Sequence, residues 1–244
     1  MTVLITGGTG RLGRHAVAAL RSRSADVRIL SRSPGIDHVV GDLSNSEGLA
    51  AALDGVDTVL HLATSRSKDV EQTQHLLDAM AGTTAHLIFI SIVGVDRIPF
   101  AYYRDKVASE KLIEASGVPF TIIRVTQFHG FVNELLERQR RSPVTLVLPI
   151  SAQTIHMPEV AERLAELVAA GPAGRVPDLG GPEQLTFTEY ARQWQAARGI
   201  RRPIWAPRLP GKTIAAFRAG HHMSGLPGAG RMTYREYLAA GGDQ

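Results

Sequence analysis

The sequence predicts an α/β fold in which a doubly wound parallel sheet carries helices on both faces and a small C-terminal lobe is appended. Short runs rich in Val, Ile and Leu alternate with amphipathic helical segments along the first half of the chain. Glycines follow the first apolar run at the spacing of a tight strand-to-helix turn. The 244 residues, 44% hydrophobic and 20% charged, suffice for one large α/β domain with an added lobe.

We expect residues 1–150 to form the α/β domain and residues 151–244 to form the lobe, with the two partly interleaved. Strands are expected at residues 3–5, 26–30, 37–40, 57–62, 86–90, 120–125, 144–148, 175–179 and 202–206. Helices are expected directly after the glycine turn, at residues 44–53, 68–80, 100–116, 158–170 and 187–198, and in two short segments near the C-terminal end. The helix at 44–53 would start from a capping box of Ser44 and Glu47.

The first functional signal is the segment Thr6-Gly-Gly-Thr-Gly-Arg-Leu-Gly13. Gly7, Gly10 and Gly13 allow the turn to leave ordinary φ/ψ space and let the backbone approach a pyrophosphate closely. The phosphates would lie at the N-terminus of the following helix, beside Arg11 and Leu12, where unpaired N–H groups favour negative charge. The segment therefore predicts a dinucleotide-binding turn.

This segment resembles the cofactor loop of extended and atypical short-chain dehydrogenases/reductases, particularly the small NmrA-like NAD(P)-binding group. The resemblance implies a Rossmann-type domain, and it is specific up to about residue 130 and general beyond that point. It places Asp42 at the adenine amino group with Leu43 beside it, although Asp42 is also typical of a plain turn. It further places Ala63, within His61-Leu-Ala-Thr-Ser65, along the cofactor.

The choice of cofactor depends on the end of the second strand, where an acidic residue would hold the adenosine ribose of NAD. Arg32 occupies that neighbourhood and no acid does. Arg32 and Arg11 could bind a 2′-phosphate through bidentate hydrogen bonds, so the sequence favours NADP(H) over NAD(H). A surface arginine at a strand end is the alternative interpretation.

The candidate catalytic residues are Tyr102, Lys106 and Ser91. Tyr102 and Lys106 are four residues apart in an expected helix, so they share one face. In carbonyl reduction a tyrosine supplies a proton to the developing alkoxide, and a nearby ammonium favours the phenolate form. Lys106 would also hold the nicotinamide ribose, and Ser91, just past the fifth strand, would orient the carbonyl oxygen. Tyr103 is adjacent, and a shift in helix phase would place it toward the cofactor instead.

Gln127, Phe128 and His129 follow the sixth strand at the edge where ligands of such sheets bind. The family resemblance places this segment opposite the nicotinamide, which makes the three residues candidates for the substrate pocket. His129 is a second candidate proton donor. A loop histidine without a functional role is the alternative.

Two functions remain open. One is an NADPH-dependent oxidoreductase that reduces a carbonyl, a quinone or a related small electrophile. The other is a non-catalytic NADP(H)-responsive sensor, because NmrA-like members often keep the fold and the cofactor without catalysis. A small-molecule substrate is expected in the first case, and the sequence leaves its identity and the oligomeric state open.

Composition argues against other classes. No cysteine is present, which excludes disulfides and thiolate sites and fits a cytoplasmic protein. No run reaches the length of a membrane span, so no membrane association is expected. The net charge of +4 comes from scattered residues apart from clusters at 138–141 and 201–202, which we interpret as solvated faces without nucleic-acid binding. The histidines lack the grouping of a metal site.

Overall fold

The computed structural model describes residues 1–65, 67–225 and 228–242 and divides the chain into two units. Unit 1 consists of Met1–Ser91, Ala101–Arg124 and Val160–Pro177. Unit 2 consists of Ile92–Phe100, Val125–Glu159 and Asp178–Gln244. The chain therefore passes between the two units several times.

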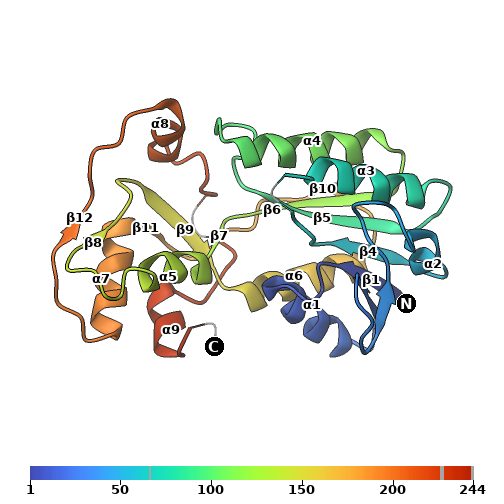
Figure 1. The fold of residues 1–244 in the computed structure, drawn as a ribbon, viewed down its shortest axis with the longest axis horizontal. Coiled ribbons are helices and arrows are strands. Elements are labelled where there is room, and N and C mark those ends of the chain that lie inside the picture. The colour runs from blue at the N-terminus through green and yellow to red at the C-terminus, as the bar shows by residue number, and fades with distance from the viewer. Residues whose placement is uncertain (66, 226–227, 243–244) are drawn as a thin grey trace. The chain divides into compact units, whose positions relative to one another are not determined.

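Unit 1 is built on a seven-stranded sheet with the order β10-β6-β5-β4-β1-β2-β3 (Figure 1). Its strands run parallel, and their long apolar runs are buried on both faces, as expected for such a sheet. The strands are β1 (Thr2–Thr6), β2 (Asp26–Ser31), β3 (His38–Val40), β4 (Thr58–His61), β5 (His86–Ile92), β6 (Phe120–Val125) and β10 (Gly174–Arg175).

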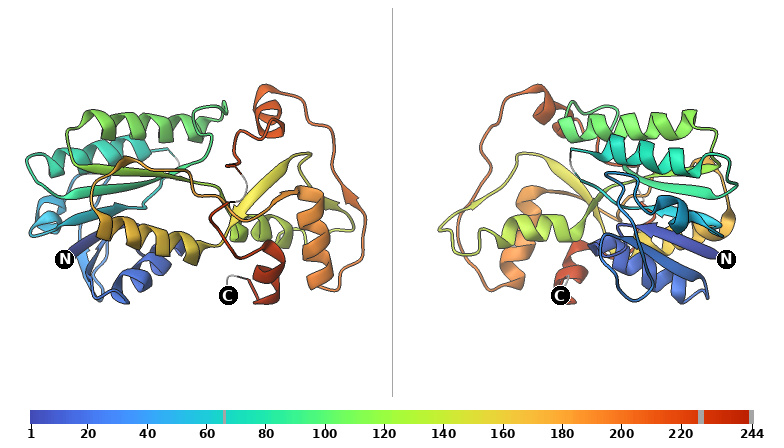
Figure 2. Two further views of the ribbon diagram at one scale, coloured as in Figure 1. Left: turned by 180° about the vertical axis from the view of Figure 1, so that it is seen from behind. Right: turned by 45° about the vertical axis from the view of Figure 1, so that its right-hand side comes forward.

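Helices cover both faces of this sheet. Helices α3 and α4 lie on one face, and α1 and α6 lie on the other (Figures 1 and 2). The helices associated with this sheet are α1 (Arg11–Arg21), α2 (Leu49–Leu53), α3 (Asp69–Met80), α4 (Ala101–Ala115) and α6 (Met157–Ala170), the last of which begins in unit 2. The expected doubly wound α/β fold is thus confirmed.

The strand order reverses between β1 and β4, since β2 and β3 extend the sheet on one side and β5 and β6 on the other. Ligands of doubly wound sheets bind at such a reversal, beyond the carboxyl ends of the strands. The chain continues there from β1 into Gly7 and from β4 into Ala63. An ideal Cβ on Gly7 would lie 2.7 Å from the Ala63 nitrogen, so these two connections meet at the reversal.

The described residues of unit 2 form two small sheets, four helices that lie within the unit and the start of α6. One sheet has the order β11-β9-β7 and the other pairs β12 with β8. The elements are β7 (Gln127–Phe128), α5 (His129–Glu137), β8 (Thr145–Leu146), β9 (Ser151–Ile155), β11 (Gln184–Thr186), α7 (Phe187–Ala197), β12 (Ile204–Trp205), α8 (Lys212–Arg218) and α9 (Tyr234–Ala239).

The core of unit 2 is aromatic. Trp194, Tyr190 and Tyr234 are completely buried, and the rings of Tyr190 and Tyr234 meet edge to face with centroids 4.8 Å apart. Capping boxes start both helices that carry these residues, with Thr186 and Thr233 as the caps of α7 and α9. Local capping and buried aromatic area therefore act together to fix these helices.

The helix predicted at 44–53 is wrong in its first half. Helix α2 spans only Leu49–Leu53 and starts after Gly48, which has φ 71°. The Ser44 nitrogen donates to Asp42 Oδ1 at 2.8 Å, and the Glu47 nitrogen donates to a neighbouring asparagine side chain. These side-chain turns satisfy the backbone without a helix, so no capping box of Ser44 and Glu47 forms.

Three segments of unit 2 form elements that the sequence analysis did not expect. Ser151–Ile155 forms the central strand of the three-stranded sheet, although Gln153 and Thr154 are polar and fully buried. Gln184–Thr186, where no strand was expected, pairs antiparallel with it. His129 begins helix α5 and does not lie on a loop.

Candidate functional site

The glycine turn after β1 has the close backbone packing that its sequence predicts. Gly7 has φ 72°, a value that disfavours a side chain. A Cβ on Gly13 would lie 2.2 Å from the Gly7 carbonyl oxygen, so only glycine fits there. The Gly10 nitrogen donates to the same carbonyl at 3.0 Å, which closes the turn. The loop is therefore compact, and the backbone can approach a ligand.

Helix α1 begins directly after this turn and has no capping side chain. Its N-cap is Gly10, and its first turn contains no acidic residue. Helices α7 and α9 are capped by Thr–Glu boxes instead. An uncapped N-terminus leaves N–H donors and the positive end of the helix dipole available to an anion. Arg11 and Leu12 are the first residues of this helix, where a pyrophosphate would be bound.

Asp42 and Arg32 lie close enough to interact electrostatically. The pKa of Asp42 is lowered, first by the hydrogen bond from the Ser44 backbone and further by the charge of Arg32. Arg32 is exposed just past the end of β2, and Leu43 is buried in the core of unit 1. An ionised acceptor and a guanidinium thus stand together at this strand edge, where they could contact the adenosine end of a nicotinamide dinucleotide.

Helix α4 presents Tyr102 and Lys106 on one side, as their spacing predicts. The Tyr102 hydroxyl lies 3.2 Å from Thr64 Oγ1 in the connection after β4. Lys106 Nζ lies 6.0 Å from the centre of the Tyr102 ring and 4.8 Å from that of Phe89. Tyr103 is buried, whereas Tyr102 is partly exposed. The phase of the helix therefore makes Tyr102 the tyrosine that contacts the loop after β4.

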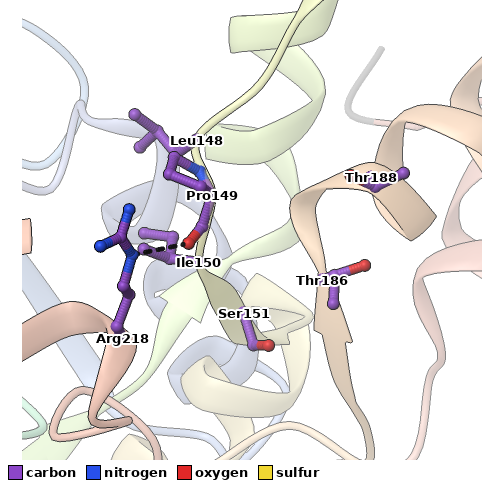
Figure 3. Close-up of a pocket in the computed structure, with 7 residues that line it drawn as sticks. All are labelled: Leu148, Pro149, Ile150, Ser151, Thr186, Thr188 and Arg218. Atoms are coloured by element: carbon purple, nitrogen blue, oxygen red, sulfur yellow. Dashed lines mark hydrogen bonds between the residues drawn. The ribbon is translucent and has the colours of Figure 1, made fainter. Parts of the chain in front are cut away.

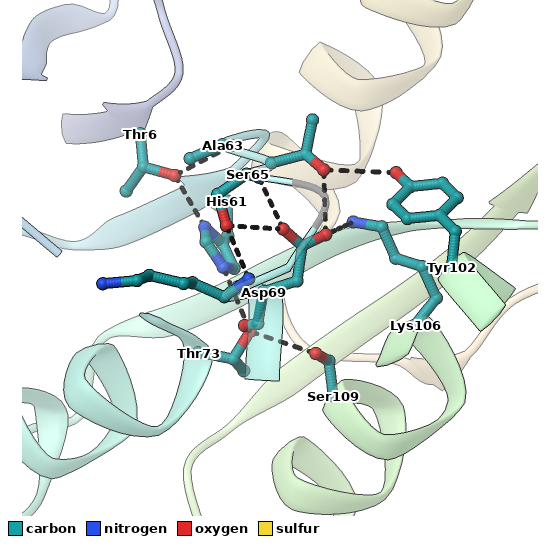
Figure 4. Close-up of polar contacts among 11 residues, drawn as sticks. Thr6, His61, Ala63, Ser65, Asp69, Thr73, Tyr102, Lys106 and Ser109 are labelled. Carbon is teal, nitrogen blue, oxygen red and sulfur yellow. Dashed lines mark hydrogen bonds and ion pairs between the residues drawn. The ribbon is translucent and has the colours of Figure 1, made fainter. Parts of the chain in front are cut away.

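The partner of Lys106 is Asp69, which begins helix α3 (Figure 4). Lys106 Nζ lies 3.4 Å from Asp69 Oδ2, and both side chains are almost fully buried. The same oxygen accepts from Thr64 Oγ1 at 2.8 Å, and Asp69 Oδ1 accepts from the Ser65 nitrogen at 2.6 Å. A continuous chain of polar contacts thus joins Tyr102, Thr64, Asp69 and Lys106.

Burial and neighbouring charges shift the pKa values of Lys106 and Asp69 in opposite directions. Burial lowers the pKa of Lys106, while the charges of Asp69 and Glu110 raise it in part. Burial raises the pKa of Asp69, but the hydrogen bond from Ser65 and the charge of Lys106 outweigh it, so the net shift is downward. Asp69 is therefore ionised near neutral pH and balances the ammonium.

Behind the ion pair lies His61, the last residue of β4. Its Nδ1 is 2.6 Å from Thr6 Oγ1, and its Nε2 is 3.4 Å from Thr73 Oγ1. Burial lowers its pKa to about 3, and the charge of Lys106 contributes in the same direction. His61 is thus a neutral, structural member of the network, and Asp69 and Lys106 are its two charged groups.

The structure does not join Ser91 to the tyrosine and lysine. Ser91 lies within β5 instead of after it, and its buried Oγ forms no hydrogen bond to Tyr102 or Lys106 among the described residues. It lies against Glu110, one turn beyond Lys106 on α4. Although burial raises the pKa of Glu110, hydrogen bonds from Arg124 and from Arg175 of β10 lower it overall.

The three substrate candidates belong to unit 2. Gln127 and Phe128 form β7 and are partly buried. His129 is 1% exposed, with Nδ1 2.6 Å from Thr154 Oγ1 and Nε2 2.9 Å from the Met232 carbonyl oxygen. Burial lowers its pKa to about 4, so it is neutral near pH 7. Both ring nitrogens are engaged within unit 2, which does not favour a proton-donor role.

Unit 2 also contains a shallow pocket of about 260 Å³ (Figure 3). Its lining is Leu148, Pro149, Ile150, Ser151, Thr186, Thr188 and Arg218. Arg218 Nε lies 3.4 Å from the Pro149 carbonyl oxygen. None of the residues that the sequence nominates for catalysis or binding lines this pocket.

Sequence reasoning missed Asp69 and Thr64. Asp69 lies in the first turn of a helix, where an acidic residue is usually explained by its favourable interaction with the helix dipole. Thr64 lies beside Ala63, in a segment that the family resemblance had already placed along the cofactor. A buried lysine needs a carboxylate partner, but nothing along the chain identified Asp69 as that partner.

Comparison with known families decides the class of this site. The sequence model of a family described as NAD(P)H-binding matches residues 7–170, which is more than half of the chain. The chain belongs to this NAD(P)H-binding family. The match begins at the first glycine of the turn and includes Tyr102 and Lys106. This membership confirms the expected class of cofactor, a nicotinamide dinucleotide, and the resemblance to short-chain dehydrogenases/reductases at the family level.

Curated relatives of this family member are distant. Photosystem II assembly factor Ycf39 of Trieres chinensis is 30% identical over 169 residues, which cover 62% of this chain and 52% of that protein. Quinone oxidoreductase 2 of Escherichia coli is 22% identical over 211 residues, which cover 78% of this chain and 72% of that protein. The chain spans only about half the length of the Ycf39 proteins that it matches.

Solved structures share the fold at low identity. The NADPH complex of the Escherichia coli quinone oxidoreductase superposes with a TM-score of 0.80 at 18% identity, covering 98% of this chain and 99% of that one. The structure of Citrobacter sp. triphenylmethane reductase with NADP(H) superposes with a TM-score of 0.82 at 18% identity, covering 98% of this chain and 99% of that one. At this identity the likeness establishes the fold.

Two further features concern membranes and metals. Among the residues that the structure describes, no helix combines the length and apolar character needed to cross a bilayer. Within the same residues, no cluster of three or more His, Cys, Asp or Glu side chains is arranged to hold a metal ion.

Proposed function

We propose that this protein is an NADPH-dependent oxidoreductase that reduces a carbonyl, a quinone or a related small electrophile. The observation that carries the proposal is the pairing of a glycine cradle at the sheet reversal with Tyr102, whose hydroxyl reaches the connection after β4. Both belong to unit 1, at the edge where the nicotinamide dinucleotide of this family would be bound. Two relatives that carry reductase names support the same class.

The glycine turn and the uncapped start of α1 would hold the pyrophosphate, with Gly7, Gly10 and Gly13 giving close access. Arg32 would bind the 2′-phosphate and Asp42 the adenine amino group. The exposed guanidinium at the strand end, where an acid would serve NAD, favours NADP(H).

The bound cofactor would supply the hydride, and the chain must supply the proton. Tyr102 would donate it, because its phenol is partly exposed and its hydroxyl reaches the connection after β4. Lys106 would lie close to Tyr102 with its positive charge balanced by Asp69, because the two side chains form an ion pair. Ser91 lies against Glu110, and Thr64 is the hydroxyl that contacts Tyr102.

A second function, an NADP(H)-responsive sensor without catalysis, is favoured by one specific observation. The Ser91 Oγ has no hydrogen-bond partner among the described residues, so no contact with Tyr102 supports a working set of Ser, Tyr and Lys. A sensor needs the cradle but not the proton donor. The substrate roles of Gln127, Phe128 and His129 stay predictions under either function.

The test is NADPH oxidation by the purified protein against a panel of carbonyl and quinone compounds. Replacement Tyr102→Phe should slow turnover by about 100- to 10,000-fold, the range for loss of a general acid, with NADPH affinity nearly unchanged. Tyr103→Phe is the matched control and should keep wild-type turnover. Tight NADPH binding without oxidation by any compound would favour the sensor, and full turnover by Tyr102→Phe would refute the assignment of the acid.

A further inference from the structure

The polar chain that ends at Tyr102 fixes the direction of its hydrogen bonds. An ionised carboxylate only accepts, so Thr64 donates its single hydroxyl proton to Asp69 Oδ2 at 2.8 Å. Thr64 Oγ1 can therefore only accept in its 3.2 Å contact with Tyr102. The phenol proton of Tyr102 consequently points to Thr64, and the protonated phenol is the form that this arrangement stabilises.

The charge of Lys106 is already compensated on the side away from Tyr102. Its Nζ lies 3.4 Å from Asp69 Oδ2, and both side chains are 5% exposed or less. A buried ammonium paired in this way has much less effect on a neighbouring phenol than an unpaired one. The sequence-based expectation that Lys106 drives Tyr102 toward phenolate therefore needs to include Asp69.

We propose that Asp69 sets the acid strength of Tyr102, acting through Thr64 and by balancing Lys106, and so keeps Tyr102 as a protonated acid. This inference rests on the proposed function, in which Tyr102 gives its proton to the substrate. Asp69 and Thr64 are positioning residues here, because they act on Tyr102 and not on the substrate. The arrangement suits reduction, which consumes a phenol proton, better than alcohol oxidation, which needs the phenolate as a base.

The proton balance of the reduction is simple. The substrate carbonyl carbon gains hydride from NADPH, which leaves NADP⁺, and the carbonyl oxygen takes the phenol proton of Tyr102. The resulting phenolate loses its donation to Thr64 and regains a proton from solvent before the next turnover. Asp69 and Lys106 keep their charges throughout this cycle.

Charged and titratable groups near this network come from α3, α4 and β4. Helix α3 contributes Asp69, and its N-cap residue Lys68 is exposed. Helix α4 contributes Lys106 and, one turn further on, Glu110, which is paired with Arg124. From β4 comes His61, which is neutral. Within the described part of unit 1, Asp69 and Lys106 are therefore the two charges whose removal should change the titration of Tyr102 most.

The experiment is a titration of the Tyr102 phenol in the full chain, followed by NMR of tyrosine labelled at the ring carbon that bears oxygen. The signal is assigned by its loss in Tyr102→Phe. Replacing Asp69→Asn leaves the Lys106 charge uncompensated and should raise the acid dissociation constant of Tyr102 about tenfold or more. Thr64→Val removes the oxygen that accepts from the phenol and should raise the acid dissociation constant of Tyr102 by a smaller factor. Thr64→Ser keeps the hydroxyl and should leave this constant unchanged.

Where the protein turns over NADPH, the alkaline limb of the kcat profile should move to lower pH in Asp69→Asn and in Thr64→Val but not in Thr64→Ser. An unchanged or smaller dissociation constant in both Asp69→Asn and Thr64→Val would overturn the inference. Because Thr64 is exposed, its variants test the inference even if Asp69→Asn does not fold. Wild-type protein without turnover would refute the proposed reductase, whereas the titration would still decide the role of Asp69.

Discussion

Replacing Gly13→Ala should abolish most of the affinity for NADPH by displacing the glycine turn. The added Cβ would lie 2.2 Å from the Gly7 carbonyl oxygen and 2.7 Å from the Gly8 backbone, whereas ordinary contacts begin near 3.4 Å. Both neighbours are backbone atoms, so the turn must move by about 1 Å. Overpacking of this kind costs about 1–3 kcal/mol, which corresponds to a loss of roughly 5- to 150-fold in affinity if binding restores the native turn.

Titration calorimetry with NADPH measures this loss, and thermal unfolding measures the accompanying change in stability. Gly82→Ala is the matched control, because Gly82 has φ 77° but an added Cβ there meets no atom within 4 Å. It should cost about 1–2 kcal/mol of stability without changing NADPH affinity. Folded Gly13→Ala protein that binds NADPH as tightly as the wild type would refute the placement of the pyrophosphate at this turn.

Three other predictions test the cofactor choice, the buried histidines and the ion pairs. Replacing Arg32→Asp should lower the ratio of NADPH to NADH affinity by roughly tenfold or more, since charged hydrogen bonds contribute about 1.5–3 kcal/mol; equal ratios in both proteins by calorimetry would exclude the 2′-phosphate role. The free energy of unfolding should fall as the pH drops from about 6.5 toward 4. Burial lowers the pKa of His86 and of His129 to about 4, so below their ordinary pKa the unfolded state binds more protons. Urea unfolding should show a loss of about 1–2 kcal/mol for each histidine at pH 5 relative to pH 7, and equal stability would contradict the neutral assignment. Glu110→Gln removes one partner of a buried ion pair and should destabilise the fold by about 3–5 kcal/mol, whereas Glu114→Gln, at a partly exposed pair, should cost at most about 1 kcal/mol; similar values for the two variants in denaturant unfolding would count against the buried pair.

The parts of this structure that could be predicted from sequence are those that local rules determine. Gly7 and Gly13 predict the turn because both glycines and the helix that follows them lie within one short stretch of sequence. Tyr102 and Lys106 share a helix face because the α-helical repeat brings residues four apart together. The doubly wound parallel sheet followed from alternating strands and helices, which restrict the topology to few choices.

The parts that were missed depend on contacts between distant segments. Asp69 and Lys106 are 37 positions apart in the sequence and meet only because α3 and α4 pack side by side on one face of the sheet. Ser91 was expected just past the end of a strand, but it lies within β5 against Glu110 of α4. Periodicity along one segment carries no information on how two helices cross.

The same limit applies to Ser151–Ile155 in unit 2. Its sequence, Ser-Ala-Gln-Thr-Ile, lacks the apolar alternation of a strand, although four of the five residues are buried. Gln153 donates to the Gly181 carbonyl oxygen at 2.8 Å, and Thr154 binds His129. These polar side chains are buried because tertiary partners satisfy them, and that pairing is not visible from the segment alone.

The central claim is that this chain transfers hydride from NADPH while Tyr102 supplies the proton. The most direct measurement is the rate of reduced-nicotinamide oxidation in a single turnover, with NADPH deuterated at the transferred position and with the compound that performs best in the panel. The account predicts a slower rate with deuterated NADPH, deuterium on the product carbon when a carbonyl is reduced, and almost no oxidation by Tyr102→Phe. Equal rates with both isotopologues and equal rates for both proteins, without deuterium in the carbonyl product, would contradict it.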